Sequence, residues 1–305
     1  MTCKFGEKKL KFAVFGTGWW SNFQIPAWLE IGNLELVALY NRTASKAHKV
    51  AEKYGISRVF DDPEELLKNV ELDFVDIITE APAHADLVKL AAKYKKPVVC
   101  QKPMAPEYHI CLEMLDVCKK NGVPLYINEN YRWQPHFRIL KRLIEEGHIG
   151  RPYRADIQLS TGGPEQLENQ PFLKTLRHFA LFDMGSHVFD VARFLFGEPD
   201  QLYCQAVRTV DWIAGDDVFA AVLTYKDMLC TCEIVDYSAT KIYVEGTKGA
   251  IELRPDNSMN IITKQGTHPV DCIKWENLDW ISKEDLKILG PECAQSIIDC
   301  QKNIL

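Results

Sequence analysis

Three things are missing from this sequence of 305 residues, and each absence excludes a class of protein. No segment is long and apolar enough to span a membrane, and the N-terminus lacks the apolar stretch of a signal peptide. Excess positive charge is also missing, since the net charge is −6 and the pI is near 5.8. We therefore expect a soluble, cytoplasmic protein that binds neither nucleic acid nor a membrane.

The ten cysteines include no Cys-x-x-Cys pair. Cys230 and Cys232 have the spacing of one strand face, and Cys111 and Cys118 lie two turns apart on a predicted helix. We interpret them as free, mostly buried thiols in a reducing compartment.

The segment Lys11 to Ser21 is an apolar strand that runs directly into a tight glycine turn. Gly16 would make the turn, and Gly18 would let the backbone approach a pyrophosphate at the N-terminus of the next helix. Ser21 replaces the third glycine of the usual dinucleotide-binding pattern. A lone glycine pair also occurs in ordinary strand-to-helix turns, so the pattern by itself does not identify a dinucleotide-binding site.

A second apolar run, residues 34–40, ends in Asn41 and Arg42, where a Rossmann unit places the residue that contacts the adenosine ribose. A carboxylate there would repel a 2′-phosphate. Asn41 accepts hydrogen bonds without that repulsion, and Arg42 offers a cation, so the pair favours NADP over NAD. The alternative is that Arg42 is a solvated surface residue.

Strands and helices alternate with short connections up to residue 127, which predicts a doubly wound parallel sheet of the Rossmann type. From residue 201 onward, β-rich runs separated by turn residues predict a mainly antiparallel open sheet in a second α/β domain. The expected domains are residues 1–127, which bind the dinucleotide, and residues 128–305, which form the second unit.

A series of motifs along the whole chain resembles the glucose-fructose oxidoreductase and inositol dehydrogenase (Gfo/Idh/MocA) family. After the glycine turn, the motifs are Thr79 with His84, Lys102-Pro103, Asn130-Tyr131-Arg132-Trp133, Gly147-His148-Ile149-Gly150, Asp183-x-Gly185-x-His187 and Gly246-Thr247-Lys248-Gly249. The resemblance implies NAD(P)-dependent oxidation or reduction of a sugar, cyclitol or related polyol. It also implies a homo-oligomer, a dimer or tetramer, formed through the open sheet.

Three departures from the family pattern affect this interpretation. Gln101 stands where the family usually has the glutamate of Glu-Lys-Pro, and Glu80 stands where it usually has proline after the threonine. Family members also usually continue beyond a helix such as residues 291–305, into a last helix that returns to the cofactor domain. We therefore expect that a final helix is missing and that an apolar patch on the Rossmann domain is uncovered.

The predicted site residues follow from the glycine turn, the strand ends and the resemblance. Those for the cofactor are Gly16, Thr17, Gly18, Trp19, Trp20, Asn41, Arg42, Thr79, Glu80, His84, Gln101 and Lys102. Those for the substrate are Asn130, Arg132, Trp133, Asp183 and His187. Plain packing is an equally good explanation of each tryptophan.

Hydride transfer from a secondary alcohol needs a base near the hydroxyl and a donor that holds the oxygen. Lys102 and His187 are the candidates, and Asp183, four residues before His187, would orient its imidazole if one helix covers both. Asp190 would face away and pack near the core. A metal site at His178, Asp183, His187 and Asp190 competes with this assignment, but we expect none.

Two other functions remain open. One is a redox-neutral glycoside hydrolase or lyase of similar fold that oxidises and then re-reduces its sugar. The other is a non-catalytic nucleotide-binding protein, which Gln101 and the short C-terminus would allow.

Overall fold

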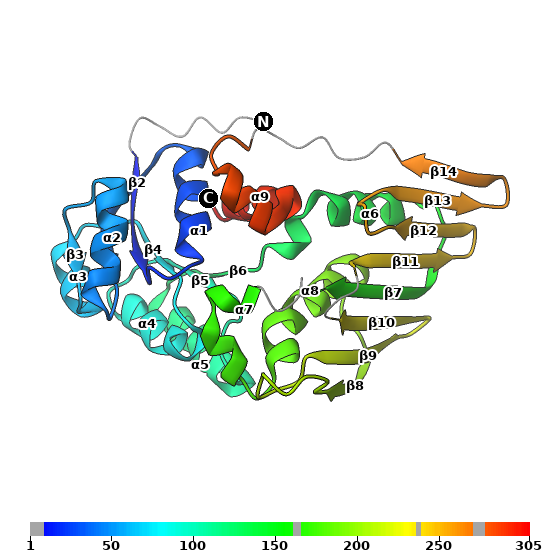
Figure 1. The fold of residues 1–305 in the computed structure, drawn as a ribbon, viewed down its shortest axis with the longest axis horizontal. Helices are drawn as coiled ribbons and strands as arrows, with labels where there is room; N and C mark the ends of the chain where they lie inside the picture. Colours follow the sequence, from blue (N-terminus) through cyan, green and yellow to red (C-terminus); the bar gives the residue numbers. More distant parts are fainter. Residues whose placement is uncertain (1–8, 161–165, 236–238, 271–277) are drawn as a thin grey trace. The chain divides into compact units, whose positions relative to one another are not determined.

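The computed structural model describes residues 9–160, 166–235, 239–270 and 278–305 (Figure 1). The segment at residues 1–8, where we expect no signal peptide, lies outside the described residues. The described chain forms two compact units. The first holds the residues up to Glu129 and those from Leu278 onward, and the second begins at Asn130 and ends at Val270.

The first unit contains a six-stranded sheet in the order β3-β2-β1-β4-β5-β6, and every neighbouring pair in it is parallel. The order reverses at β1 and β4, which is the switch point of a doubly wound fold. The predicted Rossmann architecture is therefore confirmed. The strands are β1 (Leu10–Phe15), β2 (Leu34–Tyr40), β3 (Val59–Phe60), β4 (Phe74–Ile77), β5 (Val98–Gln101) and β6 (Leu125–Asn128).

Helices connect these strands, and local signals mark several of their ends. Asp62 caps α3 by accepting hydrogen bonds from the backbone N–H groups of Glu64 and Glu65, with Pro63 in the first turn. Gly55 and Gly122 end α2 and α5 in the left-handed conformation. The helices are α1 (Ser21–Ile31), α2 (Ala44–Tyr54), α3 (Pro63–Asn69), α4 (Ala81–Lys93) and α5 (Tyr108–Asn121).

The second unit contains an eight-stranded sheet in the order β14-β13-β12-β11-β7-β10-β9-β8. All neighbouring pairs are antiparallel except β7 and β10, which confirms the expected mainly antiparallel sheet. The strands are β7 (Pro152–Ser160), β8 (Gln201–Val207), β9 (Val218–Tyr225), β10 (Met228–Val235), β11 (Lys241–Gly246), β12 (Gly249–Leu253), β13 (Met259–Thr263) and β14 (Gly266–Val270).

One face of this sheet packs against helices α6 (Pro135–Glu145) and α8 (Gly185–Phe196). Alternate strand residues such as Ala155, Ile157 and Leu159 point into that core and are almost fully buried. The residues between them point to the opposite, open face. Shorter helical segments complete the unit: η1 (Tyr131–Trp133), α7 (Gln166–Asn169), η2 (Pro171–Thr175) and η3 (Ala180–Met184).

Two glycine motifs of the second unit pack against each other. A Cβ atom on Gly246 would collide with the carbonyl oxygen of Ile149, and one on Gly150 would collide with the Thr247 hydroxyl. The Lys248 N–H donates to the Ile149 carbonyl oxygen across the same contact, at 2.8 Å. These motifs therefore fix a close approach of two turns.

The expected division at residue 127 was wrong for the end of the chain. Helix α9 (Lys283–Ile304) belongs to the first unit, where it packs on α1 (Figure 1). It consists of two helical parts: one begins at Lys283, capped by Ser282, and the expected helix from Pro291 follows a break at Gly290, whose φ is 75°.

The apolar face of α1 is covered by this same helix. Ala294, Ile297 and Ile298 of α9 pack against Phe23 and Ala27 of α1, and all five residues are buried. Helix α9 therefore covers this face, and the uncovered patch that we expect from a missing final helix stays a prediction. The described helices include none that is both long and apolar enough to cross a lipid bilayer.

Candidate active site

The turn after β1 has the geometry that the glycine pattern predicts. Gly16 has a φ of 104°, and a Cβ atom there would lie 2.6 Å from the carbonyl oxygen of Ile78. Only glycine fits this position. At Gly18, by contrast, a Cβ atom would meet no atom within 4 Å, so the backbone there has open space in front of it.

The same turn presents unused backbone donors. The N–H groups of Thr17, Gly18, Trp19 and Trp20 donate no hydrogen bond within the described part of the chain. Helix α1 follows directly and has no acidic residue in its first turn. Consecutive N–H groups at a helix N-terminus suit the oxygens of a pyrophosphate, so these residues fit a dinucleotide.

The rings of Trp19 and Trp20 are packing residues. Each contacts Phe23, with ring centroids 4.8 and 5.5 Å apart, and both join the cluster between α1 and α9. The Trp20 indole Nε1 donates to the Gln24 side-chain oxygen at 3.0 Å. The predicted cofactor contacts of Trp19 and Trp20 are therefore contacts of their backbone N–H groups and not of their rings.

The end of β2 carries the two residues that were predicted to distinguish NADP from NAD. The Asn41 amide nitrogen donates to the Thr17 hydroxyl at 2.6 Å, and its amide oxygen accepts from the Thr43 N–H at 2.9 Å. Asn41 thus ties the glycine turn to the start of α2. Arg42 is exposed and makes no hydrogen bond or ion pair with the described residues.

His84 links the ends of β4 and β5. Its ring is fully buried, with Nε2 2.9 Å from the carbonyl oxygen of Thr79 and Nδ1 3.0 Å from that of Pro103. Burial lowers the pKa of His84, although the backbone carbonyls oppose this. The imidazole therefore connects the loop after β4 to the loop after β5. The Thr79 hydroxyl is buried and has no hydrogen-bond partner among the described residues, and Glu80 is exposed.

Gln101 ends β5 and is nearly buried. Its amide nitrogen donates to the Gln24 side-chain oxygen at 2.8 Å, and its amide oxygen accepts from the Lys102 backbone N–H at 2.6 Å. Lys102 is half-buried, and its peptide bond to Pro103 is cis. The side-chain oxygen of Gln101 therefore holds the backbone of Lys102.

Sequence reasoning missed a carboxyl group behind this strand end. Asp76, in β4, is completely buried, and its partners are the Gln24 amide and the indole of Trp28. Burial raises the pKa of Asp76 to about 7, against the opposing effect of these hydrogen bonds. An acid within a strand of four buried residues was the available signal.

In the second unit, His187 lies in the first turn of α8 and Asp183 lies in the preceding segment η3, which is a π-helical turn. The condition that one α-helix covers both residues is therefore not met, and the four-residue spacing does not by itself place them on one face. His187 is 3% exposed. Asp183 is partly exposed.

Tyr131 is a second residue that the sequence did not assign. Its ring stacks on the His187 imidazole with centroids 3.8 Å apart and planes 16° apart. Its place beside the predicted Asn130 and Arg132 was the only signal. The stack restricts rotation of the imidazole, so Tyr131 orients His187.

The other predicted substrate residues of this unit have partners within it. Arg132 forms a two-pronged ion pair with Asp190, which accordingly packs near the core as expected, and its guanidinium lies over Phe194. Trp133 lies under the guanidinium of Arg138, 4.7 Å from ring centroid to Cζ. Asn130 is buried.

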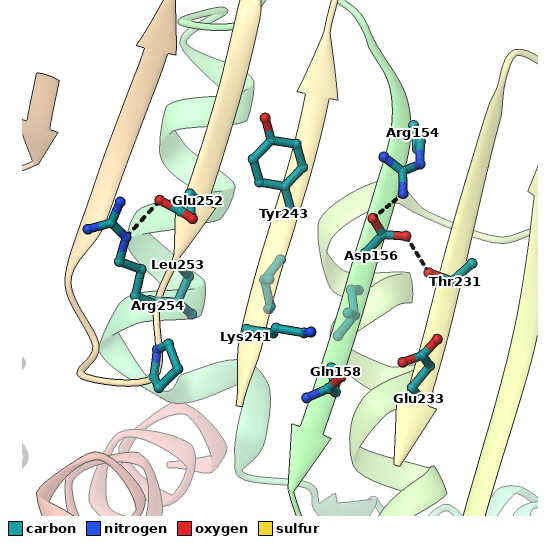
Figure 2. Close-up of a pocket in the computed structure, with 13 residues that line it drawn as sticks. Arg154, Asp156, Gln158, Thr231, Glu233, Lys241, Tyr243, Glu252, Leu253 and Arg254 are labelled. Atoms are coloured by element: carbon teal, nitrogen blue, oxygen red, sulfur yellow. Dashed lines mark hydrogen bonds and ion pairs between the residues drawn. The ribbon is translucent and has the colours of Figure 1, made fainter. Parts of the chain in front are cut away.

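No group of three or more potential metal-ligating side chains comes together among the described residues. A shallow hollow lies elsewhere, on the open face of the second sheet (Figure 2). Arg154, Asp156 and Thr231 form a hydrogen-bonded row across it, with Arg154 also paired to Glu245. Its polar lining contains none of the predicted site residues.

Comparison with known proteins gives two family matches. Residues 10–129 match the "Oxidoreductase family, NAD-binding Rossmann fold", and residues 137–252 match the "GFO/IDH/MocA C-terminal domain". Together the matched segments span most of the chain.

Individual relatives are enzymes with carbohydrate or cyclitol names. D-apiose dehydrogenase from Paraburkholderia graminis is 32% identical over 90% of this chain and 76% of its own length. Myo-inositol 2-dehydrogenase from Thermotoga maritima is 29% identical over 71% of this chain and 66% of its own length.

One solved structure is similar over nearly the whole chain. It is an oxidoreductase from Agrobacterium radiobacter in complex with NAD⁺, L-tartaric acid and magnesium. Its TM-score is 0.89 at 27% identity, and the match covers 97% of this chain and 87% of that one.

Proposed function

The chain belongs to the Gfo/Idh/MocA family of NAD(P)-dependent oxidoreductases, and we propose that it transfers a hydride between the nicotinamide and a CH–OH carbon of a sugar, cyclitol or related polyol. The observation that carries the proposal is the turn at Gly16 to Trp20, with four unused N–H donors and open space at Gly18. The relatives are named as dehydrogenases, which gives no support to the redox-neutral or non-catalytic alternatives.

The dinucleotide would be held by the glycine turn through its pyrophosphate and by residues 41 and 42 at its adenosine ribose. When bound, the nicotinamide accepts a hydride during alcohol oxidation and returns it during carbonyl reduction. We assign NADP at least the affinity of NAD, because an exposed cation and no carboxylate follow β2.

Proton transfer falls to Lys102 and His187. Alcohol oxidation breaks the C–H bond with its electron pair and the O–H bond, so the hydroxyl proton must pass to a protein group. Lys102 is placed by Gln101, and His187 is held by the ring of Tyr131. Asp183 and Asn130 contribute to substrate binding in this assignment. Arg132 contributes indirectly, by fixing Asp190 and the segment that carries Tyr131.

The test follows the absorbance of reduced nicotinamide with D-apiose, myo-inositol and L-tartrate, each with NAD and NADP. Lys102→Met and His187→Ala should each lower kcat about a hundredfold and leave dinucleotide affinity nearly unchanged. Lys119→Met and His109→Ala, at exposed positions of α5, are the matched controls. A loss confined to KM would assign both residues to substrate binding alone.

We also propose that the enzyme is a homo-oligomer formed through the open face of the second sheet and that it works in the cytoplasm. The eight described cysteines are free thiols, which suits a reducing compartment. On the sheet face, Tyr203, Val222 and Leu229 expose 66%, 37% and 54% of their surface beside the charged row of Figure 2. A broad face that combines exposed apolar and charged side chains is typical of subunit interfaces.

A further inference from the structure

A buried chain of hydrogen bonds begins at Asp76. The Gln24 amide nitrogen donates to both of its carboxyl oxygens, at 2.7 and 2.9 Å, and the Trp28 indole donates to one of them at 2.8 Å. These partners are all donors, so the carboxyl group acts only as an acceptor. A buried carboxyl costs folding free energy that an apolar side chain would not, which indicates that it has a task.

The donor-to-acceptor direction of these hydrogen bonds is fixed by two indole N–H groups, one at Asp76 and one at Gln24. An indole N–H can only donate, so Trp28 requires an acceptor at Asp76 and Trp20 requires an acceptor at Gln24. Gln24 must therefore turn its nitrogen towards Asp76 and its oxygen towards Trp20. That oxygen also accepts from the amide nitrogens of Gln101 and Asn128, both at 2.8 Å.

The orientation of the Gln24 amide in turn sets the orientation of the Gln101 amide at the Lys102 backbone. Because Gln101 must give its nitrogen to Gln24, its oxygen is left to accept the Lys102 backbone N–H at 2.6 Å. Reversal of either amide would place two acceptors or two donors face to face. The orientation of Gln101 at Lys102 thus depends on a carboxyl group two side chains away.

We propose that Asp76 is a positioning residue, whose carboxyl group sets the direction of the Gln24 and Gln101 amides and thereby fixes Lys102 for hydride transfer. The part that concerns catalysis rests on the proposed function, since it assumes that Lys102 acts in the reaction. The structural part, that Asp76 controls the hydrogen bond at the Lys102 backbone, does not.

Asp76→Asn tests the proposal, because an asparagine whose oxygen accepts from Trp28 turns its own N–H groups towards the Gln24 amide nitrogen, which sets donor against donor and displaces Gln24. We expect kcat to fall about tenfold, the equivalent of one hydrogen bond, with KM and dinucleotide affinity within about threefold of wild type. Asp73→Asn is the matched control. It is the same change close by in sequence, where the carboxylate accepts from the Lys11 N–H instead.

A new carboxyl group at position 101 should compensate for the loss of the carboxyl group at position 76. Gln101→Glu alone would set an acceptor against the Gln24 oxygen and lower kcat. In Asp76→Asn/Gln101→Glu, the Gln24 and Asn128 amides can both reverse while the new carboxyl group still offers an acceptor to the Lys102 N–H, and only the partly buried hydrogen bond from Trp20 is lost. We therefore expect a higher kcat for the double variant than for either single one. Additive losses, or an unchanged kcat in Asp76→Asn, would overturn the proposal.

A further measurement and a further variant test the proposal independently of the double variant. Hydrogen exchange at the Lys102 amide should be about tenfold faster in Asp76→Asn than in wild type, and this holds even if no polyol is turned over. If Asp76→Asn does not fold, Gln101→Met can be used instead. It removes the hydrogen bonds of the Gln101 side chain to Gln24 and to the Lys102 backbone, and it should give the same loss of kcat. Unchanged exchange and unchanged kcat in these variants would reject Asp76 as a positioning residue.

Discussion

Gly16 and Gly18 stand one residue apart in the same turn but have different requirements. Gly16 is needed by the fold, because its φ of 104° and its closeness to the Ile78 carbonyl exclude any side chain. Gly18 has open space in front of it, so a side chain there is sterically compatible with the fold. The predicted need for glycine at position 18 is therefore the approach of the dinucleotide, not the fold.

Gly18→Val should therefore leave the fold intact and weaken either dinucleotide by more than about tenfold, since the branched side chain would fill the space that the pyrophosphate needs. Calorimetric titration with NAD and NADP measures the loss, and circular dichroism verifies the fold. Gly16→Val serves as the contrast, because it should lower the melting temperature itself. Unchanged affinity in folded Gly18→Val would place the dinucleotide elsewhere.

Arg42 is the residue on which the NADP prediction depends. Asn41 already uses both ends of its amide within the chain, on Thr17 and on Thr43, so selectivity for the 2′-phosphate falls to the exposed arginine. A charge-assisted hydrogen bond to phosphate contributes about 1.5–3 kcal/mol.

Arg42→Ala should accordingly weaken NADP by about tenfold or more and leave NAD binding unchanged. Titration of both dinucleotides into Arg42→Ala and into Lys49→Ala, an exposed lysine of α2, gives the comparison. A preference for NAD in the wild type that survives the Arg42 change would contradict the prediction.

Among the elements, α9 has the clearest energetic role. Ile297 is fully buried against α1, whereas Ile288 of the same helix is 47% exposed. Ile297→Ala removes a buried side chain and should lower the free energy of unfolding by about 2–5 kcal/mol.

Chemical denaturation measures this loss, with Ile288→Ala as the matched control, for which we expect less than about 1 kcal/mol. Equal effects at the two positions would mean that α9 adds little to the stability of the first unit.

Element prediction from the sequence succeeded where the pattern was local. The strand at residues 34–40 has the predicted bounds, and the glycine turn leads directly into a helix, α1, as predicted. In these segments the periodicity, the caps and the glycines all act within a few residues.

Other features depend on groups far apart in the sequence. A helix at residues 291–305 was expected from the sequence, but nothing local identifies α1 as the surface that it covers. The π-helical turn at Asp183 and the stacking of Tyr131 on His187 depend on tertiary packing. Asp76 was overlooked because its partners, Gln24 and Trp28, lie on α1, 52 and 48 positions earlier in the chain.

For the molecule as a whole, the open face of the second sheet predicts self-association. Tyr203, Val222 and Thr231 lie opposite one another on β8, β9 and β10, and this row continues into the hollow of Figure 2 at Asp156. A charge at its centre would have to be buried without a partner in any interface formed there.

Val222→Arg should therefore shift the enzyme from oligomer to monomer in analytical ultracentrifugation. Leu112→Arg, at an exposed apolar position of α5, should not. A monomeric wild type, or an oligomer that Val222→Arg leaves intact, would reject this face as the interface.

The packing of α9 on α1 has a consequence for synthesis on the ribosome. Phe23 and Ala27 emerge early, but Ile297, which covers them, is added only after the whole second unit. At about 5–20 residues per second, the nascent first unit spends roughly 10 to 50 s with an apolar helix face uncovered. Chaperones that bind exposed apolar segments would meet this face throughout that interval, until Ile297 has emerged and covers it.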